Sequence, residues 1–330
     1  MQDLSRRALL AALLAAPFAA RAQAPLERIT VAGWSKPITE VTPLLVDEDK
    51  GFYRAQGVDL RYVPGAGSAD AIRNILSGQA DVAFADPGSF FAALDKGEKL
   101  RAIYDIYPRN VFNVVSLRGS GIAKPADLKG RKIGVYSLAS GTRQALQVLL
   151  HSAGLTEADV TVVVTGVLNF APLIQGQVDA TAATDTGLLV GRRRGLPEVD
   201  VMQVGDVLPA SSDLFVVRDD VYRSRREALR RFLRAYRDAA AWMIARPEEA
   251  AQLAAKRAID GTDPALNLEI IRLRNAASVS ALTRAKGLGA IDVAALQAAA
   301  DVYRKLGLVQ RALDVRQVVS EDLLPQGGAQ

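Results

Sequence analysis

The chain has 330 residues, of which 49% are hydrophobic and 23% are charged, so it can bury a large core and form about two domains. It contains no cysteine, which excludes disulfides, thiolate metal sites and cysteine nucleophiles. Its single histidine, His151, excludes multi-histidine metal centres. The net charge of +5 is small, and only 6% of the residues are aromatic, which argues against a nucleic-acid groove. We expect no nucleic-acid partner, no metal and no cofactor.

The first 24 residues have the layout of a secretory signal peptide. Arg6 and Arg7 form a short basic region, an apolar run of Ala and Leu follows over 8–16, and residues 22–24 form an Ala-Gln-Ala cleavage site. The apolar run is shorter than the roughly 20 residues needed to span a bilayer. The stretch Ser-Arg-Arg-Ala-Leu-Leu over 5–10 also resembles a twin-arginine export signal. We expect a soluble periplasmic protein that begins near Pro25.

Strand and helix patterns alternate along the rest of the chain. Hydrophobic periodicity predicts strands over 28–33, 58–63, 81–85, 111–117, 132–136, 160–164, 178–183 and 214–218. Start and stop signals predict helices over 39–56, 68–78, from 86 onwards, 142–153, 170–175 and 225–245. Such alternation is typical of a doubly wound, mostly parallel α/β sheet with helices on both faces.

A repeated sequence pattern predicts that the chain forms two related lobes. Residues 76–83 and 174–181 share one pattern, in which a helix end is followed by Gly-Gln, an Asp and a strand. The strands over 111–117 and 214–218 suit a two-strand hinge between the lobes. We expect residues 25–114 to form the N-terminal part of lobe 1 and 115–214 to form lobe 2. Residues 215–330 should then return to lobe 1 and add C-terminal helices.

Small and polar residues follow the predicted strands, where ligands bind in open α/β sheets. Backbone N–H groups at helix starts favour anionic ligand groups, although Ser68, Asp86 and Thr142 are also preferred helix N-caps. The candidate ligand-binding residues are Trp34, Ser35, Gly67, Ser68, Asp86, Ser89, Tyr136, Ser140, Gly141, Thr142, Asn169, Phe170 and Asp185.

The aromatic and acidic candidates suggest how a ligand would be held. Trp34 follows a strand and is suited to stacking on a planar ligand, with Tyr136 and Phe170 on the other side of the pocket or in the core. Asp86 and Asp185 are suited to accept hydrogen bonds from an amino group. These side chains leave two ligand classes open: a sulfonate or carboxylate, and a planar heteroaromatic ring.

Catalytic motifs are missing from the sequence. There is no GxSxG, no phosphate-binding loop and no HExxH. His151 falls late in a predicted helix, away from the strand ends. Residues 65–70 begin like a dinucleotide fingerprint, but they lack the third Gly and follow the second strand. We do not expect an enzyme.

Several short motifs, taken in order, carry a family resemblance. They are Lys50-Gly51-Phe52-Tyr53 with Gly57-Val58-Asp59-Leu60, Gly78-Gln79-Ala80-Asp81 leading to Ala85-Asp86-Pro87-Gly88-Ser89, Gly119-Ser120-Gly121-Ile122, and the runs over 127–135, 232–236 and 247–251. Over residues 29–325 the sequence resembles the solute-binding proteins of ABC importers in the nitrate, sulfonate, taurine and thiamine-pyrimidine group.

The resemblance implies a type II periplasmic binding fold, whose two lobes close on a solute. It implies a monomer that presents a small molecule, such as a pyrimidine, to a membrane permease and its ATPase. Two alternatives stay open. One is a periplasmic sensor subunit. The other is an enzyme resembling the fungal pyrimidine synthases of this group, which sacrifice their own histidine and use a cysteine-rich motif; this chain has no cysteine.

Overall fold

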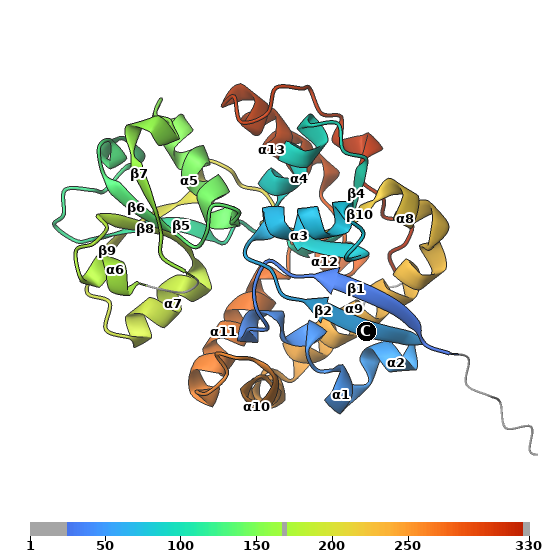
Figure 1. Ribbon diagram of the computed structural model, residues 1–330. Coiled ribbons are helices and arrows are strands. Elements are labelled where there is room, and N and C mark those ends of the chain that lie inside the picture. The colour runs from blue at the N-terminus through green and yellow to red at the C-terminus, as the bar shows by residue number, and fades with distance from the viewer. Residues whose placement is uncertain (1–24, 167–169, 326–330) are drawn as a thin grey trace, which may run out of the picture.

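The computed structural model describes residues 25–166 and 170–325. The expected signal peptide over 1–24 and the candidate Asn169 lie outside the described residues. Two five-stranded sheets organise the described chain, each inside its own lobe (Figure 1). We call the lobe built around the first sheet lobe 1 and the other lobe 2.

Sheet 1 has the order β2-β1-β3-β10-β4. Its strands are β1 (Glu27–Ala32), β2 (Val58–Val63), β3 (Val82–Ala85), β4 (Leu100–Tyr107) and β10 (Asp213–Arg218). β1 pairs in parallel with β2 and β3, whereas β10 runs antiparallel to both β3 and β4. The carboxyl ends of the parallel strands therefore meet the amino end of β10 at one edge of the sheet.

Sheet 2 repeats this plan with the order β7-β6-β8-β5-β9. Its strands are β5 (Phe112–Leu117), β6 (Lys132–Val135), β7 (Thr161–Val164), β8 (Ala180–Thr184) and β9 (Val199–Gln203). β6 pairs in parallel with β7 and β8, and β5 is the antiparallel strand, paired with β8 and β9. The predicted fold class, two lobes with mostly parallel sheets, is confirmed. β4 and β9 are strands that the sequence patterns did not predict.

The chain crosses between the sheets twice. It leaves β4 at Tyr107 and enters β5 at Phe112, then leaves β9 at Gln203 and enters β10 at Asp213. The strands predicted over 111–117 and 214–218 are thus β5 and β10, and each belongs to one sheet. The return crossover holds a short 3-10 turn, η4 (Val204–Asp206).

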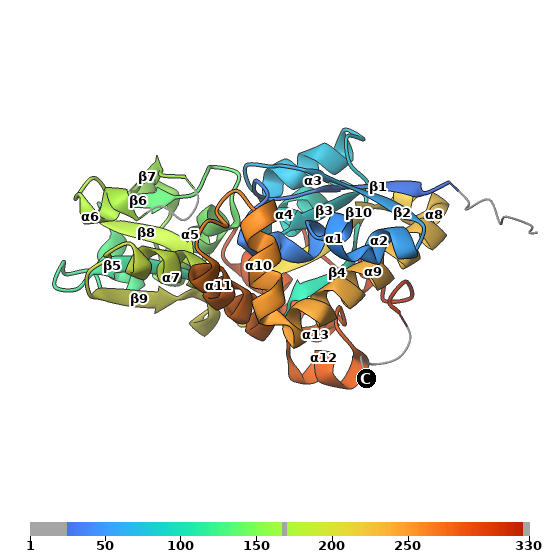
Figure 2. The same cartoon turned by 90° about the horizontal axis from the view of Figure 1, so that it is seen from below.

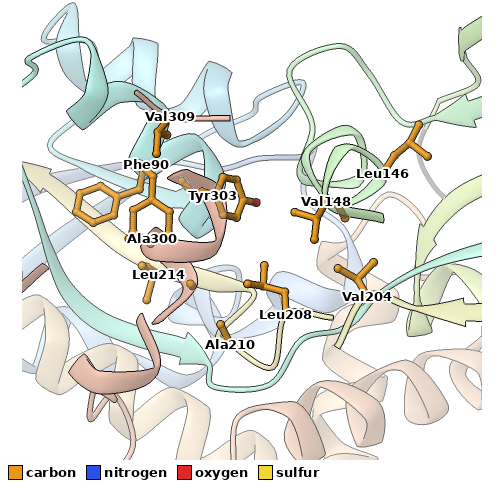
Figure 3. Packing of buried hydrophobic residues seen from close by; sticks show 14 of the residues in the cluster. Phe90, Leu146, Val148, Val204, Leu208, Ala210, Leu214, Ala300, Tyr303 and Val309 are labelled. Atoms are coloured by element: carbon orange, nitrogen blue, oxygen red, sulfur yellow. The ribbon is translucent and has the colours of Figure 1, made fainter. Parts of the chain in front are cut away.

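The return crossover is packed into the core rather than exposed. One continuous hydrophobic cluster joins helices of both lobes, and Val204, Leu208 and Ala210 belong to it. Figure 3 shows Leu208 between Tyr303 of lobe 1 and Val148 of lobe 2. The two lobes therefore share buried apolar surface beside the crossover.

Helices cover both faces of each sheet. In lobe 2 they are α5 (Gly141–Ser152), α6 (Ala171–Ile174) and α7 (Asp185–Arg193), and in lobe 1 they are α3 (Ser68–Leu76), α4 (Pro87–Asp95), α8 (Asp219–Ser224), α9 (Arg226–Ala245), α10 (Pro247–Arg257), α11 (Pro264–Ala277), α12 (Ala281–Lys286) and α13 (Val293–Lys305). The predicted apolar stripe of α9 is buried, with Leu229, Phe232 and Tyr236 packed in the lobe 1 core. Helix α11 lies beside α7 where the lobes meet (Figures 1 and 2).

The single helix predicted over 39–56 is wrong. The segment forms a 3-10 helix η1 (Thr39–Leu44), then two one-turn helices, α1 (Asp47–Lys50) and α2 (Phe52–Ala55). Pro43 lies inside η1, and its ring lacks the N–H that a continuing α-helix needs. Gly51 separates α1 from α2 with a left-handed φ of 71°. Among the described helices, none is long and apolar enough to cross a membrane.

Candidate functional site

The edges of the two sheets that carry most of the candidate residues face each other across a cavity. It lies where the lobes meet. Its lining residues are Trp34, Glu40, Gly67, Ser68, Val111, Phe112, Tyr136, Ser140, Gly141, Thr142, Thr184, Asp213 and Arg274. Seven of the predicted residues are therefore brought together in one place: Trp34, Gly67, Ser68, Tyr136, Ser140, Gly141 and Thr142.

A second cavity shares part of this wall. Trp34, Tyr136, Thr142 and Thr184 line both cavities, and the predicted Phe170 lines the second. The Trp34 and Tyr136 rings meet edge to face, with centroids 6.3 Å apart and an interplanar angle of 77°. Aromatic walls of this kind favour a planar or apolar ligand body.

Loops from both lobes touch at one side of the first cavity. The Tyr136 hydroxyl donates to the Gly65 carbonyl at 3.3 Å, and the Ala69 N–H donates to the Ala139 carbonyl at 3.0 Å. Gly67 has a φ of 133°, and a Cβ there would lie 2.3 Å from the Ala139 oxygen. Only glycine is accommodated where two backbones lie this close together, so the contact indicates that the lobes are closed.

Charged side chains join the lobes on the other side. The Thr186 hydroxyl of lobe 2 donates to Glu40 Oε1 of lobe 1 at 2.6 Å. Arg274 of α11 pairs with Asp185 of lobe 2 and lies 3.7 Å from Glu40 Oε2. Arg274 is 1% exposed and Glu40 is 2% exposed, and the guanidinium also lies 5.0 Å from the centre of the Tyr107 ring. Burial raises the pKa of Glu40, while Arg274 and the Thr186 hydrogen bond act in the opposite direction.

Comparison with known proteins agrees with this architecture. The model of a protein family described as NMT1/THI5 like matches residues 38–250, well over half of the chain. The chain belongs to the NMT1/THI5-like family. This finding confirms the group that the sequence motifs resemble.

Individual relatives of this NMT1/THI5-like protein differ in their named activities. It is 26% identical over 321 residues to the riboflavin-binding protein RibY of Chloroflexus aurantiacus, covering 96% of this chain and 91% of that protein. It is 25% identical over 221 residues to the 4-amino-5-hydroxymethyl-2-methylpyrimidine phosphate synthase THI12 of Saccharomyces cerevisiae, covering 63% of this chain and 64% of that protein. Binding proteins and synthases thus both occur among its relatives.

Solved structures share the fold of this NMT1/THI5-like protein. The alkanesulfonate-binding protein SsuA from Xanthomonas axonopodis pv. citri, bound to MOPS, has a TM-score of 0.71 at 19% identity, covering 90% of this chain and 99% of that one. The periplasmic aliphatic sulphonate binding protein SsuA from Escherichia coli has a TM-score of 0.65 at 18% identity, covering 91% and 94%. The chain therefore has the fold of periplasmic binding proteins.

Of the three residues expected to be helix N-caps in this NMT1/THI5-like protein, Asp86 is one, whereas Ser68 and Thr142 are not, because Gly67 and Ser140 hold the N-cap positions of α3 and α5. Asp86 caps α4 and accepts from the Ser89 N–H at 2.8 Å and the Ser89 hydroxyl at 2.9 Å. Ser68 accepts from the Asp86 N–H at 3.0 Å. Burial raises the pKa of Asp86, against these hydrogen bonds. Asp86 lines a third cavity, and both of its carboxylate oxygens already accept from Ser89.

Three candidates line none of these three cavities. Ser35 is fully buried and donates to the Lys36 carbonyl. Ser89 is occupied in the α4 cap, and Asp185 is paired with Arg274. Their contacts position neighbouring segments, since none of the three is among the residues that line the first cavity.

Sequence reasoning missed the acidic and basic side chains of the site. Glu40 comes from η1, Arg274 from the last turn of α11, and Asp213 is the first residue of β10. The Asp213 carboxylate has no hydrogen-bond partner among the described residues. Burial and nearby carboxylates raise its pKa well above the usual range for Asp. His151 lies in the last turn of α5, away from the cavity lining.

Proposed function

We propose that this protein is an exported solute-binding receptor of an ABC importer, which traps a small planar organic solute between its lobes. The observation that carries the proposal is the cavity at the facing sheet edges, where aromatic and polar residues of both lobes converge. A solute that contacts both lobes binds the closed state better than the open one, so it drives closure. The closed protein then presents the solute to a permease and its ATPase.

The cavity wall favours a planar heteroaromatic solute over a small sulfonate or carboxylate. Arg274 is the one cation in the lining of the two cavities, as far as the described residues show, and Glu40 and Asp185 already oppose its charge. A compact anion needs a charged partner of its own. Trp34 and Tyr136 offer a flat apolar ring something to pack against. The name of the riboflavin-binding relative supports the same choice.

The remaining parts of the proposal concern the whole chain. We place lobe 1 around sheet 1 and lobe 2 around sheet 2, with boundaries at the crossovers over 108–111 and 204–212. The sequence expectations of a signal peptide, a periplasmic location, possible use of the twin-arginine route and a monomeric state belong to this proposal. Fusion of residues 1–30 to a reporter, with the Arg pair replaced by Lys, tests the export route.

The test of binding uses the mature chain from Pro25. Thermal unfolding is scanned against flavins, pyrimidines, aromatic acids, sulfonates and nitrate, because a ligand at a hundredfold excess over Kd stabilises the native state by about 2.7 kcal/mol. Denatured protein is also analysed by mass spectrometry for a released small molecule. Stabilisation by one chemical class supports the receptor. An empty protein that binds none of them contradicts it.

Two other functions share the fold. A sensor subunit would bind the same solute, and genes for a receptor rather than a permease beside this one would favour it. The named synthases among the relatives raise an enzyme as the second candidate. This chain has no cysteine, and its one histidine lies outside the cavity lining, so the described site offers no such reactive pair. Conversion of a trapped ligand, followed by mass spectrometry, would favour the enzyme.

A further inference from the structure

Asp213 differs from the carboxylates around it because no group of the described structure donates a hydrogen bond to it. Asp213 is 6% exposed and lines the first cavity. Its side chain has no hydrogen-bond partner within the described parts of the chain. The Asp213 oxygens are not among the buried atoms that are closed off without a partner, so they keep accessible surface on which a solute can donate. A largely buried carboxylate with no donor from the protein is unfavourable.

Each neighbouring carboxylate has at least one hydrogen-bond donor from the protein itself, although Asp105 Oδ1 is buried without one. Glu40 accepts from Thr186, and Asp86 accepts from Ser89. Asp105 accepts from the Ser211 hydroxyl at 2.6 Å. The contrast singles out Asp213 as the acid whose partner is not part of the fold.

Charge around Asp213 favours a donor and opposes an anion. The carboxylates of Asp86, Glu40 and Asp105 all act on Asp213 with the same sign and raise its pKa, after burial. The only cation in the lining, Arg274, is held by Glu40 and Asp185 within the described structure. A second anion brought to this wall would meet like charge, which strongly disfavours binding.

Unused donors complement Asp213. The indole N–H of Trp34 is buried without a partner, as is Nε of Arg274, and both residues line the same cavity as Asp213. In the adjoining cavity the Thr181 hydroxyl oxygen is also buried and unpartnered. Buried polar atoms in native proteins are normally satisfied. The two unpartnered N–H groups at the first cavity therefore suit a ligand with acceptors on its rim, and Asp213 suits a donor beside them.

Building on the proposed function, we propose that Asp213 is a specificity-determining residue, which accepts a hydrogen bond from a ring N–H or amino group of the solute. The ligand class is then an uncharged or cationic planar nitrogen heterocycle with an N–H donor beside carbonyl or imine acceptors. The N–H donor of the solute faces Asp213, and the acceptors of the solute can bind the unpartnered N–H groups of Trp34 and Arg274. Sulfonates and other compact anions are excluded by the acidic wall.

The experiment measures binding of lumiflavin, 4-amino-5-hydroxymethyl-2-methylpyrimidine and MOPS by calorimetry. The proteins are the parent mature chain, Asp213→Asn and Asp105→Asn. The last variant is the matched control, because Asp105 is also a buried carboxylate, accepts from the Ser211 hydroxyl and is not among the residues lining the first cavity. We expect an N–H heterocycle to bind the parent and the control alike, and Asp213→Asn to bind it at least about tenfold more weakly, since the amide replaces one carboxyl oxygen with an NH2 group that cannot accept from the solute.

A second measurement leaves the protein unchanged. Lumiflavin methylated at its imide nitrogen lacks the donor, so it should bind the parent at least about tenfold more weakly, and Asp213→Asn should cost it nothing further. Equal binding of the methylated and unmethylated ring would overturn the role of Asp213. Preference for MOPS over both heterocycles would overturn the inference and leave the receptor function intact. Binding of no probe class, with no released molecule, would overturn both.

Discussion

The buried arginine that joins the lobes gives the sharpest test of the site's electrostatics. Arg274→Met keeps most of the aliphatic volume and removes the charge from beside Glu40 and Asp185. Removing one partner of a buried ion pair costs about 3–5 kcal/mol, because the other charge is left without compensation. Asp185 is partly exposed, with 35% of its side chain accessible, and regains water. We therefore expect a loss near the lower end, about 3 kcal/mol at pH 7.5.

The loss should shrink in acid. In Arg274→Met the positive charge that lowers the pKa of Glu40 is absent, so burial raises that pKa further than in the parent. A carboxyl whose folded pKa is raised is stable when protonated, and its contribution is lost as pH rises above the unfolded value of about 4.3. Arg274→Met should thus be less destabilising at pH 5 than at pH 7.5.

Urea unfolding followed by tryptophan fluorescence measures both effects. Arg272→Met is the matched control on the same helix, because its side chain is 59% exposed and pairs with the exposed Glu248, a contact worth about 0–1 kcal/mol. Adding Glu40→Gln should recover part of the loss in Arg274→Met, with a coupling energy of about 1–3 kcal/mol. A loss below that of the control at pH 7.5, or strict additivity of the two changes, would refute the reasoning.

Three further variants test closure, titration and stacking. Gly67→Ala should lower ligand affinity about tenfold and leave the liganded protein with a larger radius of gyration in X-ray scattering, because backbone strain and the Ala139 contact together cost about 1–3 kcal/mol. The control Gly119→Ala, also at positive φ but with open space around it, should change neither the affinity nor the radius. Burial raises the pKa of Asp105 to about 8, so the free energy of unfolding should fall by up to about 1.4 kcal/mol per pH unit between about pH 4 and 8. Urea titrations should show a smaller fall for Asp105→Asn. The same pH dependence in the parent and the variant would show that Asp105 is not the group that titrates. Trp34→Ala should weaken binding of a planar ligand about tenfold or more, and Trp34→Phe should weaken it less; unchanged titrations for the alanine variant would count against stacking.

Local patterns were enough to predict most of the elements that position the site. β1, β2 and β6 follow their hydrophobic runs closely, and α9 buries the predicted stripe. These predictions succeed because strand and helix periodicity depends on residues close together in the chain. Helix caps also follow from residue type, which is why Asp86 is correctly expected to cap α4.

Long-range partners explain the strands that were missed. β4 contains Arg101 and Asp105, which break the alternation of apolar residues. The fold satisfies them elsewhere, since Arg101 pairs with Asp219 and Asp105 accepts from Ser211. Such charges look unsuitable for a strand until their distant partners are known.

Glu40 and Arg274 were missed for the same reason. They meet only through the tertiary fold, at 3.7 Å, and no local pattern links η1 to the last turn of α11. A lone Arg in an amphipathic helix is usually a surface residue. Here it is 1% exposed, which only the contact between α11 and lobe 2 explains.

Asp213 was missed because of the rule used to search for it, and it could have been found. The search took residues that follow parallel strands, where ligands gather. An antiparallel strand in the same sheet presents its first residue, not its last, at that edge. The two predicted crossover strands are the antiparallel ones, β5 and β10, and the cavity is lined by the residues that open them, Phe112 and Asp213. The site of a two-lobed binding protein should therefore be sought both after its parallel strands and at the start of its crossover strands.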